Sequence, residues 1–176
     1  VVPRGGREWT QPADFPGFSW RDVAQVCPRG ECSGALPGSA FDLTGFTWAA
    51  PEDVRLLLES YIDSADFAEP ATTFGERAAA WAAALFSDFD CSACLGQRAS
   101  VLGILTSTLS SNTTVQVAEV RDRELNDVDE VQLALSQPLD EPVSGVAPLF
   151  WRPGVPDMAS LPTLGTGAAV VCRTDG

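Results

Sequence analysis

The chain has 176 residues, enough for one domain of ordinary size, and its 45 % hydrophobic and 20 % charged residues are typical of a globular protein. It carries 11 basic residues, all of them arginine, against 24 acidic residues. The net charge of −13 disfavours nucleic acid and anionic membrane surfaces as partners, and it favours a protein with a basic face. The absence of histidine excludes Ser-His and Cys-His nucleophile pairs and histidine metal sites. No apolar run approaches the ~18 to 20 residues that a membrane-spanning helix needs.

The first segments predict a strand and a helix. The sequence "GREWTQ", from Gly6 to Gln11, reads as a short opening strand with Trp9 as its aromatic anchor. In "SWRDVAQVC", Ser19 can cap the start of a helix, and Asp22, three residues later, can complete a variant of the capping box. Pro28 ends this helix. The apolar residues of this segment then share one helical face: Trp20, Val23, Ala24 and Cys27.

The next segments predict two more helices. "FDLTGFTW" reads as extended chain that turns at Gly45 and leads to Pro51, a residue that the first helical turn accepts. Glu52 and Asp53 favour the positive helix start, and the inward stripe comprises Val54, Leu57, Leu58 and Tyr61. A third helix is expected from about Phe74 to Phe86, opened by Thr73 with Glu76.

After "DFDCSACLG" the pattern changes to short β-type runs: "SVLGILTST", "TVQVAEVR", "EVQLALS", "APLFW" and "AAVVCR". The first of these could also be helical, because short apolar runs are ambiguous. Helices mainly in the first half and a small antiparallel sheet mainly from the second half define an α+β class. Six prolines between Pro138 and Gly167 predict long irregular loops there: Pro138, Pro142, Pro148, Pro153, Pro156 and Pro162.

Four blocks carry a resemblance to a known group. They are "REWTQ", "SWRDVAQVC", "LTGFTWAAPEDVRLLLESY" and the terminal "VVCRTDG". In this order they resemble secreted bacterial proteins of unknown function that carry a "LTGwTWAS..dV..Lf" motif and, more distantly, Lcl C-terminal domains, which have a C-type-lectin-like fold. "FTWAAPEDV" stands where the Lcl pattern has "WRLPT", and the calcium-binding tripeptides of sugar-binding C-type lectins do not occur as a set.

The resemblance implies one extracytoplasmic domain over residues 1–176, of C-type-lectin-like type, that is periplasmic, cell-surface or secreted. We expect a non-catalytic binding or adhesion domain with a protein partner. The alternative is an accessory or structural subunit of a larger extracytoplasmic assembly. A glycan ligand stays open, although no motif supports one. The absence of histidine argues against an enzyme.

Five cysteines fit an oxidising compartment: Cys27, Cys32, Cys91, Cys94 and Cys172. Local pairs Cys27–Cys32 and Cys91–Cys94 are favoured, because "CPRGEC" is a compact turn and the secreted group carries a similar element. The lectin-like alternative joins Cys27 to Cys172. A redox role for "CSAC" is disfavoured by Asp88 and Asp90, which would raise the thiol pKa, and a four-thiolate zinc site lacks the small ribbon that such sites usually staple.

The acidic run "RDRELNDVDE" offers oxygen ligands for a structural calcium ion as a cofactor. Its candidate ligands are Asp122, Glu124, Asn126, Asp127, Asp129 and Glu130. Calcium takes roughly six to eight oxygens, which a loop can bring together, but the run lacks the spacing and the glycine of an EF-hand. The alternative is a solvated hairpin loop between "VQVAEV" and "VQLAL".

Overall fold

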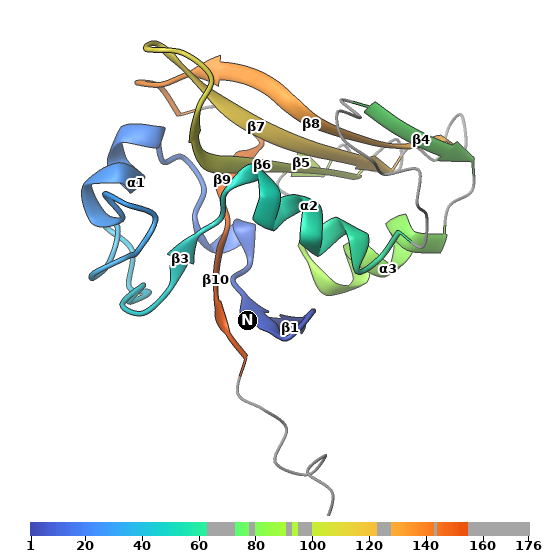
Figure 1. Ribbon diagram of the computed structural model, residues 1–176, viewed down its shortest axis with the longest axis horizontal. Helices are drawn as coiled ribbons and strands as arrows, with labels where there is room; N and C mark the ends of the chain where they lie inside the picture. The colour runs from blue at the N-terminus through green and yellow to red at the C-terminus, as the bar shows by residue number, and fades with distance from the viewer. Residues whose placement is uncertain are drawn as a thin grey trace, which may run out of the picture.

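The computed structural model describes residues 1–62, 73–77, 80–90, 93–94, 100–122, 128–142 and 144–154. Within these ranges the chain is a mixed α+β structure with two sheets and three α-helices (Figure 1). The helices are α1 (Trp20–Val26), α2 (Pro51–Glu59) and α3 (Ala80–Asp88), and a 3-10 turn, η1, covers Pro12–Asp14. None of the described helices is long and apolar enough to cross a membrane.

The smaller sheet joins the beginning of the chain to a late segment. Its order is β1-β2-β10-β3, with β1 (Val2–Arg4), β2 (Arg7–Trp9), β3 (Thr47–Trp48) and β10 (Phe150–Pro153). Strand β10 is antiparallel to both neighbours, so that Trp151 lies opposite Trp9 and Phe150 lies opposite Trp48. The expected opening strand around Trp9 is therefore present, and a second strand, β1, precedes it.

The larger sheet has six strands in the order β4-β8-β7-β6-β5, and β9 also pairs with β6. Its members are β4 (Thr73–Arg77), β5 (Ala93–Cys94), β6 (Ser100–Leu109), β7 (Thr114–Asp122), β8 (Val128–Pro138) and β9 (Val146–Pro148). The run "SVLGILTST" is thus a strand. The sheet is larger than expected, and it is mixed rather than antiparallel, because β9 runs parallel to β6.

Two of the predicted helix starts are confirmed in detail. The Ser19 hydroxyl accepts the Asp22 backbone N–H, and the Asp22 carboxylate accepts the Ser19 N–H at 2.9 Å, which completes a capping box. Helix α2 begins at Pro51, and the Asp53 carboxylate accepts the Ala50 N–H at 2.9 Å. Its buried stripe is Val54, Leu57 and Leu58, while Tyr61 is half-buried just beyond the helix end.

The third helix prediction is wrong at its start. Residues Thr73–Arg77 form strand β4, and α3 begins only at Ala80. Strand β4 pairs with β8 in the register Phe74 opposite Val131. A cap-like Thr-x-x-Glu spacing is a local signal, and the ladder to β8 is a long-range partner that the local pattern does not contain.

The expectation of long loops after Pro138 is also wrong in part. Pro148 and Pro153 are the last residues of the short strands β9 and β10. Proline lacks an N–H, so it is tolerated where a strand ends and no ladder bond is needed. Residues 155–176, including "AAVVCR", lie outside the described residues.

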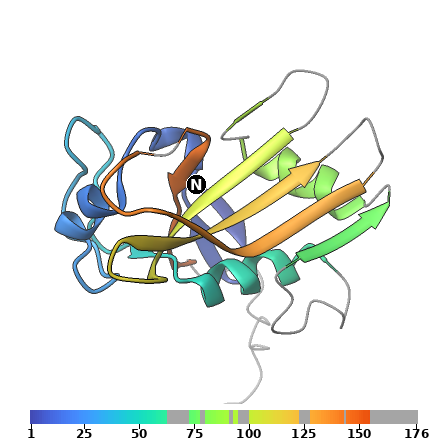
Figure 2. The same ribbon diagram turned by 90° about the horizontal axis from the view of Figure 1, so that it is seen from above.

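The core has two parts that follow the layers. Helices α2 and α3 both lie against one face of the larger sheet (Figures 1 and 2), and their buried residues include Leu58 and Leu85. The second part gathers around α1 and β3 and includes Val23 and Trp48, both almost inaccessible to solvent. This second part lies beside the candidate site.

Candidate binding pocket

One wall of the candidate site is α1 together with the loop that follows it. Cys27 and Cys32 form a disulfide, and the Gly30 N–H donates to the Cys27 carbonyl at 3.1 Å to close a tight turn. Gly30 has φ 83°, a left-handed conformation that glycine adopts without strain. The Gly30 carbonyl accepts the Trp48 N–H at 2.6 Å, and the Cys32 N–H donates to the Phe46 carbonyl at 2.9 Å. The disulfide loop is therefore fixed along β3.

The facing wall comes from β3 and β6. The Trp48 side chain is 2 % exposed, and its indole N–H donates to the Leu105 carbonyl at 3.0 Å. The Ser107 N–H donates to the Ala49 carbonyl at 2.9 Å, which joins the end of β6 to the segment after β3. The Trp20 ring on α1 lies 5.5 Å from the Trp48 ring, centroid to centroid, at an interplanar angle of 46°.

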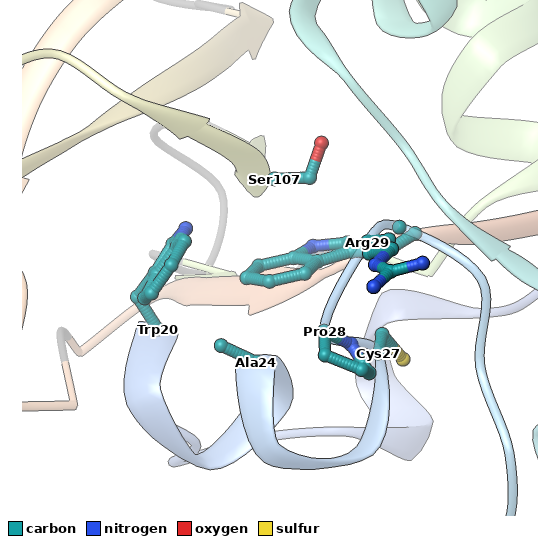
Figure 3. Close-up of a pocket in the computed structure, with 8 residues that line it drawn as sticks. Trp20, Ala24, Cys27, Pro28, Arg29 and Ser107 are labelled. Atoms are coloured by element: carbon teal, nitrogen blue, oxygen red, sulfur yellow. The ribbon is translucent and has the colours of Figure 1, made fainter.

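These walls line a partly open pocket of about 220 Å³. Figure 3 shows Trp20 at one end and Arg29 at the other, with Ser107 on the side opposite Ala24 and Pro28. Because a liquid water occupies roughly 30 Å³ and drug-sized ligands fill pockets of about 300 Å³ or more, this pocket suits a small ligand or one unit of a larger one. Its lining residues are Trp20, Ala24, Cys27, Pro28, Arg29, Gly30, Trp48 and Ser107.

Three polar groups at the pocket have no partner within the described part of the chain. Arg29 is exposed and forms no ion pair. The Ser107 hydroxyl makes no side-chain hydrogen bond there. The Trp20 indole N–H is buried and has no acceptor. A buried donor without an acceptor costs about 1 to 3 kcal/mol. Arg29 and Ser107 are accessible and can bind a ligand, whereas the Trp20 N–H can do so only if its ring turns.

Three of the five tryptophans are buried in the core: Trp9, Trp48 and Trp81. Trp20 and Trp151 are only half-buried. Sequence reasoning placed Trp20 on the inward face of α1 and did not single out Arg29 or Ser107. The "CPRGEC" turn was the one available signal for this site, because a closed loop after a helix presents its middle residues beside that helix.

The predicted Cys27–Cys32 pair is present as a disulfide. Cys91 lies outside the described residues, and so does Cys172, so that the Cys91–Cys94 pairing and the role of the fifth cysteine stay predictions. The alternative bond from Cys27 to Cys172 does not form, because the Cys27 sulfur is bonded to Cys32.

Of the six predicted calcium ligands, Glu124, Asn126 and Asp127 lie outside the described residues. Asp122 ends β7, and Asp129 and Glu130 are neighbours on β8, which therefore point to opposite faces of the sheet. Strands β7 and β8 do form the expected antiparallel hairpin. Over the described ranges no group of three or more acidic or cysteine side chains could hold a metal ion, and calcium binding through the intervening loop stays a prediction.

A separate polar cluster joins the N-terminal strand to the helices. The Tyr61 hydroxyl donates to the Asp88 carboxylate at 2.6 Å, and the Arg4 guanidinium lies 3.9 Å from the Tyr61 ring centroid. Burial, and secondly the Asp88 hydrogen bond, raise the pKa of the Tyr61 phenol far above its usual range. Tyr61 is thus held as a protonated donor, which suits a structural link between α2 and α3.

Comparison of the chain with family models, with curated proteins and with solved structures gives no significant match. The pocket and the acidic charge of the chain are therefore the features that bear on its function.

Proposed function

We propose that the chain is a non-catalytic extracytoplasmic binding domain of C-type-lectin-like type that holds its ligand in the pocket between Trp20, Trp48 and Arg29. The observation that carries the proposal is the set of unpartnered polar groups at this small pocket, Arg29 above all. Binding sites commonly combine aromatic walls with a few polar groups that fix the orientation of the ligand.

Two further observations support the compartment and the fold type. The Cys27–Cys32 disulfide is the kind of bond that persists in oxidising compartments. Helices α1 and α2 follow the opening strands β1 and β2, which is the order of features that the resemblance implies.

The proposal can be tested by titrating the protein with a panel of small glycans, amino acids and organic acids while tryptophan fluorescence and indole N–H NMR signals are followed. We expect at least one ligand to shift the Trp20 signal and to lose affinity in Trp20→Phe. Trp151→Phe is the matched control, because Trp151 is also half-buried with an unpartnered indole N–H but does not line the pocket. A panel that leaves the Trp20 signal unchanged, or hits equally weakened by both variants, would contradict the proposal.

The alternative function, an accessory subunit in an extracytoplasmic assembly, is favoured by the charge distribution. Most of the arginines whose side chains are described form ion pairs with carboxylates of the same chain. The sequence has 24 acidic and 11 basic residues, and the resulting net charge of −13 would attract a basic partner. Such a subunit should bury more than ~1,000 Å² against its partner in the native particle. Isolation of the protein from its source as a monomer at low ionic strength would exclude this alternative.

A further inference from the structure

Arg29 differs from the other arginines whose side chains the structure describes. It forms no ion pair within the described ranges, although Glu31 is only two residues away. In a chain with net charge −13, an arginine without a carboxylate partner is the exception. Each of the other six pairs with a carboxylate of the chain: Arg4 with Asp88, Arg7 with Asp53, Arg21 with Asp140, Arg55 with Glu52 and Glu59, Arg121 with Glu119, and Arg152 with Glu8.

The side chains that line the pocket offer donors but no carboxylate. Among the described residues, the eight that line it include neither aspartate nor glutamate, although the chain has 24 of them. Arg29 supplies a permanent cation with several N–H donors, and Ser107 supplies a hydroxyl. The Trp48 indole N–H already donates to the Leu105 carbonyl, and the Trp20 N–H is buried. A negatively charged oxygen is the partner to which both accessible groups, Arg29 and Ser107, can donate.

The backbone that carries Arg29 is held in place before any ligand arrives. The Cys27–Cys32 disulfide closes the loop around Arg29, and the hydrogen bond from the Trp48 N–H to the Gly30 carbonyl fixes the loop along β3. A guanidinium on a fixed backbone loses less conformational freedom on binding, and it offers two parallel N–H groups to an oxyanion. Figure 3 shows this guanidinium at the end of the pocket opposite Trp20.

The net negative charge of the chain does not cancel the local attraction of Arg29. Charges in contact with solvent are largely screened from one another beyond about 8 Å at physiological ionic strength. An anion bound to Arg29 lies at hydrogen-bond distance from the guanidinium, whereas no acidic side chain is among the described residues that line the pocket. The attraction and the long-range repulsion both grow with the charge of the ligand, so they select an anion without selecting between a carboxylate and a phosphate.

The remaining lining side chains are apolar, and they favour an apolar body on the ligand. Trp20 and Ala24 on α1 are half-buried and Pro28 is exposed, so all three are accessible to a ligand, while the buried Trp48 ring lies behind them. Burial of apolar surface against such a wall is favourable. A cavity of about 150 Å³ can hold benzene, so the volume of about 220 Å³ has room for one such ring with an acid group.

We infer that the pocket binds a small organic acid, with its oxyanion on Arg29 and Ser107 and a compact apolar body against Trp20, Ala24 and Pro28. This inference rests on the proposed function and specifies its ligand class. Organic carboxylates and organic phosphates share this chemistry, and the titration below distinguishes them.

The test is a titration of the full chain with sodium benzoate and with phenyl phosphate, followed by NMR of the Trp20 indole N–H. Benzyl alcohol is the neutral analogue with the same ring, and acetate is the acid without the ring. We expect benzyl alcohol to bind roughly tenfold to hundredfold more weakly than the tighter of the two acids, the range for loss of a charge-assisted hydrogen bond. Acetate should be weaker than benzoate by a similar factor, because it buries no ring.

Substitutions separate the acid group from the ring. Arg29→Gln should weaken the tighter acid by roughly tenfold to hundredfold and leave benzyl alcohol unchanged. Ser107→Ala should weaken the same acid by roughly threefold to tenfold, because it removes a neutral donor. Arg21→Gln is the matched control for Arg29→Gln, because it removes the same charge from an exposed arginine outside the pocket.

Tighter binding of benzoate identifies a carboxylate as the acid group, tighter binding of phenyl phosphate identifies a phosphate, and equal affinities support both. Benzyl alcohol or acetate binding as tightly as the acids, or Arg29→Gln and Arg21→Gln weakening them equally, would overturn the inference while the pocket remains a binding site. Failure of both acids when another ligand in the wider panel shifts the Trp20 signal also overturns it. If no ligand of any class shifts that signal, the proposed function itself fails.

Discussion

Gly103 in β6 gives the sharpest prediction about the fold, because a single methyl group tests the parallel pairing with β9. A Cβ at this position would lie 2.4 Å from the Gly145 carbonyl oxygen and 3.0 Å from a methyl group of Val146. Real Cβ atoms do not approach backbone oxygen so closely, and so β9 must move away from the register Gly103 opposite Val146. Overpacking of this kind costs about 1 to 3 kcal/mol, so Gly103→Ala should lose roughly 2 kcal/mol of unfolding free energy.

The assay is urea unfolding followed by tryptophan fluorescence, with a thermal melt as a second measurement. A loss of about 2 kcal/mol corresponds to a fall of roughly 4 to 8 °C in Tm for a chain of this size. The double variant Gly103→Ala with Val146→Ala separates the two contacts: it relieves the side-chain contact but leaves the carbonyl, and we expect no recovery. Full recovery in the double variant, or a neutral Gly103→Ala, would refute the reasoning that the backbone of β9 is the obstacle.

Three further predictions concern the phenol, the disulfide and the acidic run. The pKa of Tyr61 is raised in the folded chain, so its contribution to the free energy of unfolding is complete below its ordinary pKa of 10.0 and falls as the pH rises above that value. In urea unfolding above pH 10.0, Tyr61→Phe should therefore lose less stability than the unsubstituted chain. Identical alkaline profiles of the two proteins would contradict this. Replacing Cys27 and Cys32 together by alanine opens a loop with a sequence separation of 5 and should lower the free energy of unfolding by about 2 kcal/mol in the same assay. The double variant should also bind ligand more weakly at the pocket. Unchanged binding would show that the loop keeps Arg29 in place without the disulfide. Millimolar calcium should raise Tm, and Asp127→Asn should abolish the rise. A Tm that does not change when calcium is added would show that the acidic run does not bind the ion.

The local signals of the sequence were enough to predict two helices in detail. Ser19 with Asp22, and Pro51 with Asp53, specify helix starts through contacts within a few residues, and both starts are confirmed. The same kind of signal failed at Thr73 with Glu76, where a strand forms instead. The difference lies in β8, a partner more than fifty residues away, because a local pattern does not contain long-range pairing.

The candidate pocket could be predicted only in part. The compact "CPRGEC" turn indicated the Cys27–Cys32 bond, and this bond is present. Ser107, however, reaches the pocket because the end of β6 is hydrogen-bonded to Ala49, and Trp48 is held beside the disulfide loop because its N–H donates to the Gly30 carbonyl. No spacing within the sequence brings these segments together.

The sequence by itself determined the properties that depend on residue identity and near neighbours: an acidic globular chain without histidine, two capped helices, a closed disulfide turn and a mixed α+β class. The tertiary structure alone decided the parallel pairing of β9 with β6, the strand at Thr73 and the fact that Arg29 has no carboxylate partner among the described residues. The physical reason is range. Caps and tight turns are set by bonds over three to five residues, whereas strand pairing and the fate of an individual charge depend on which distant segments the folded core brings into contact.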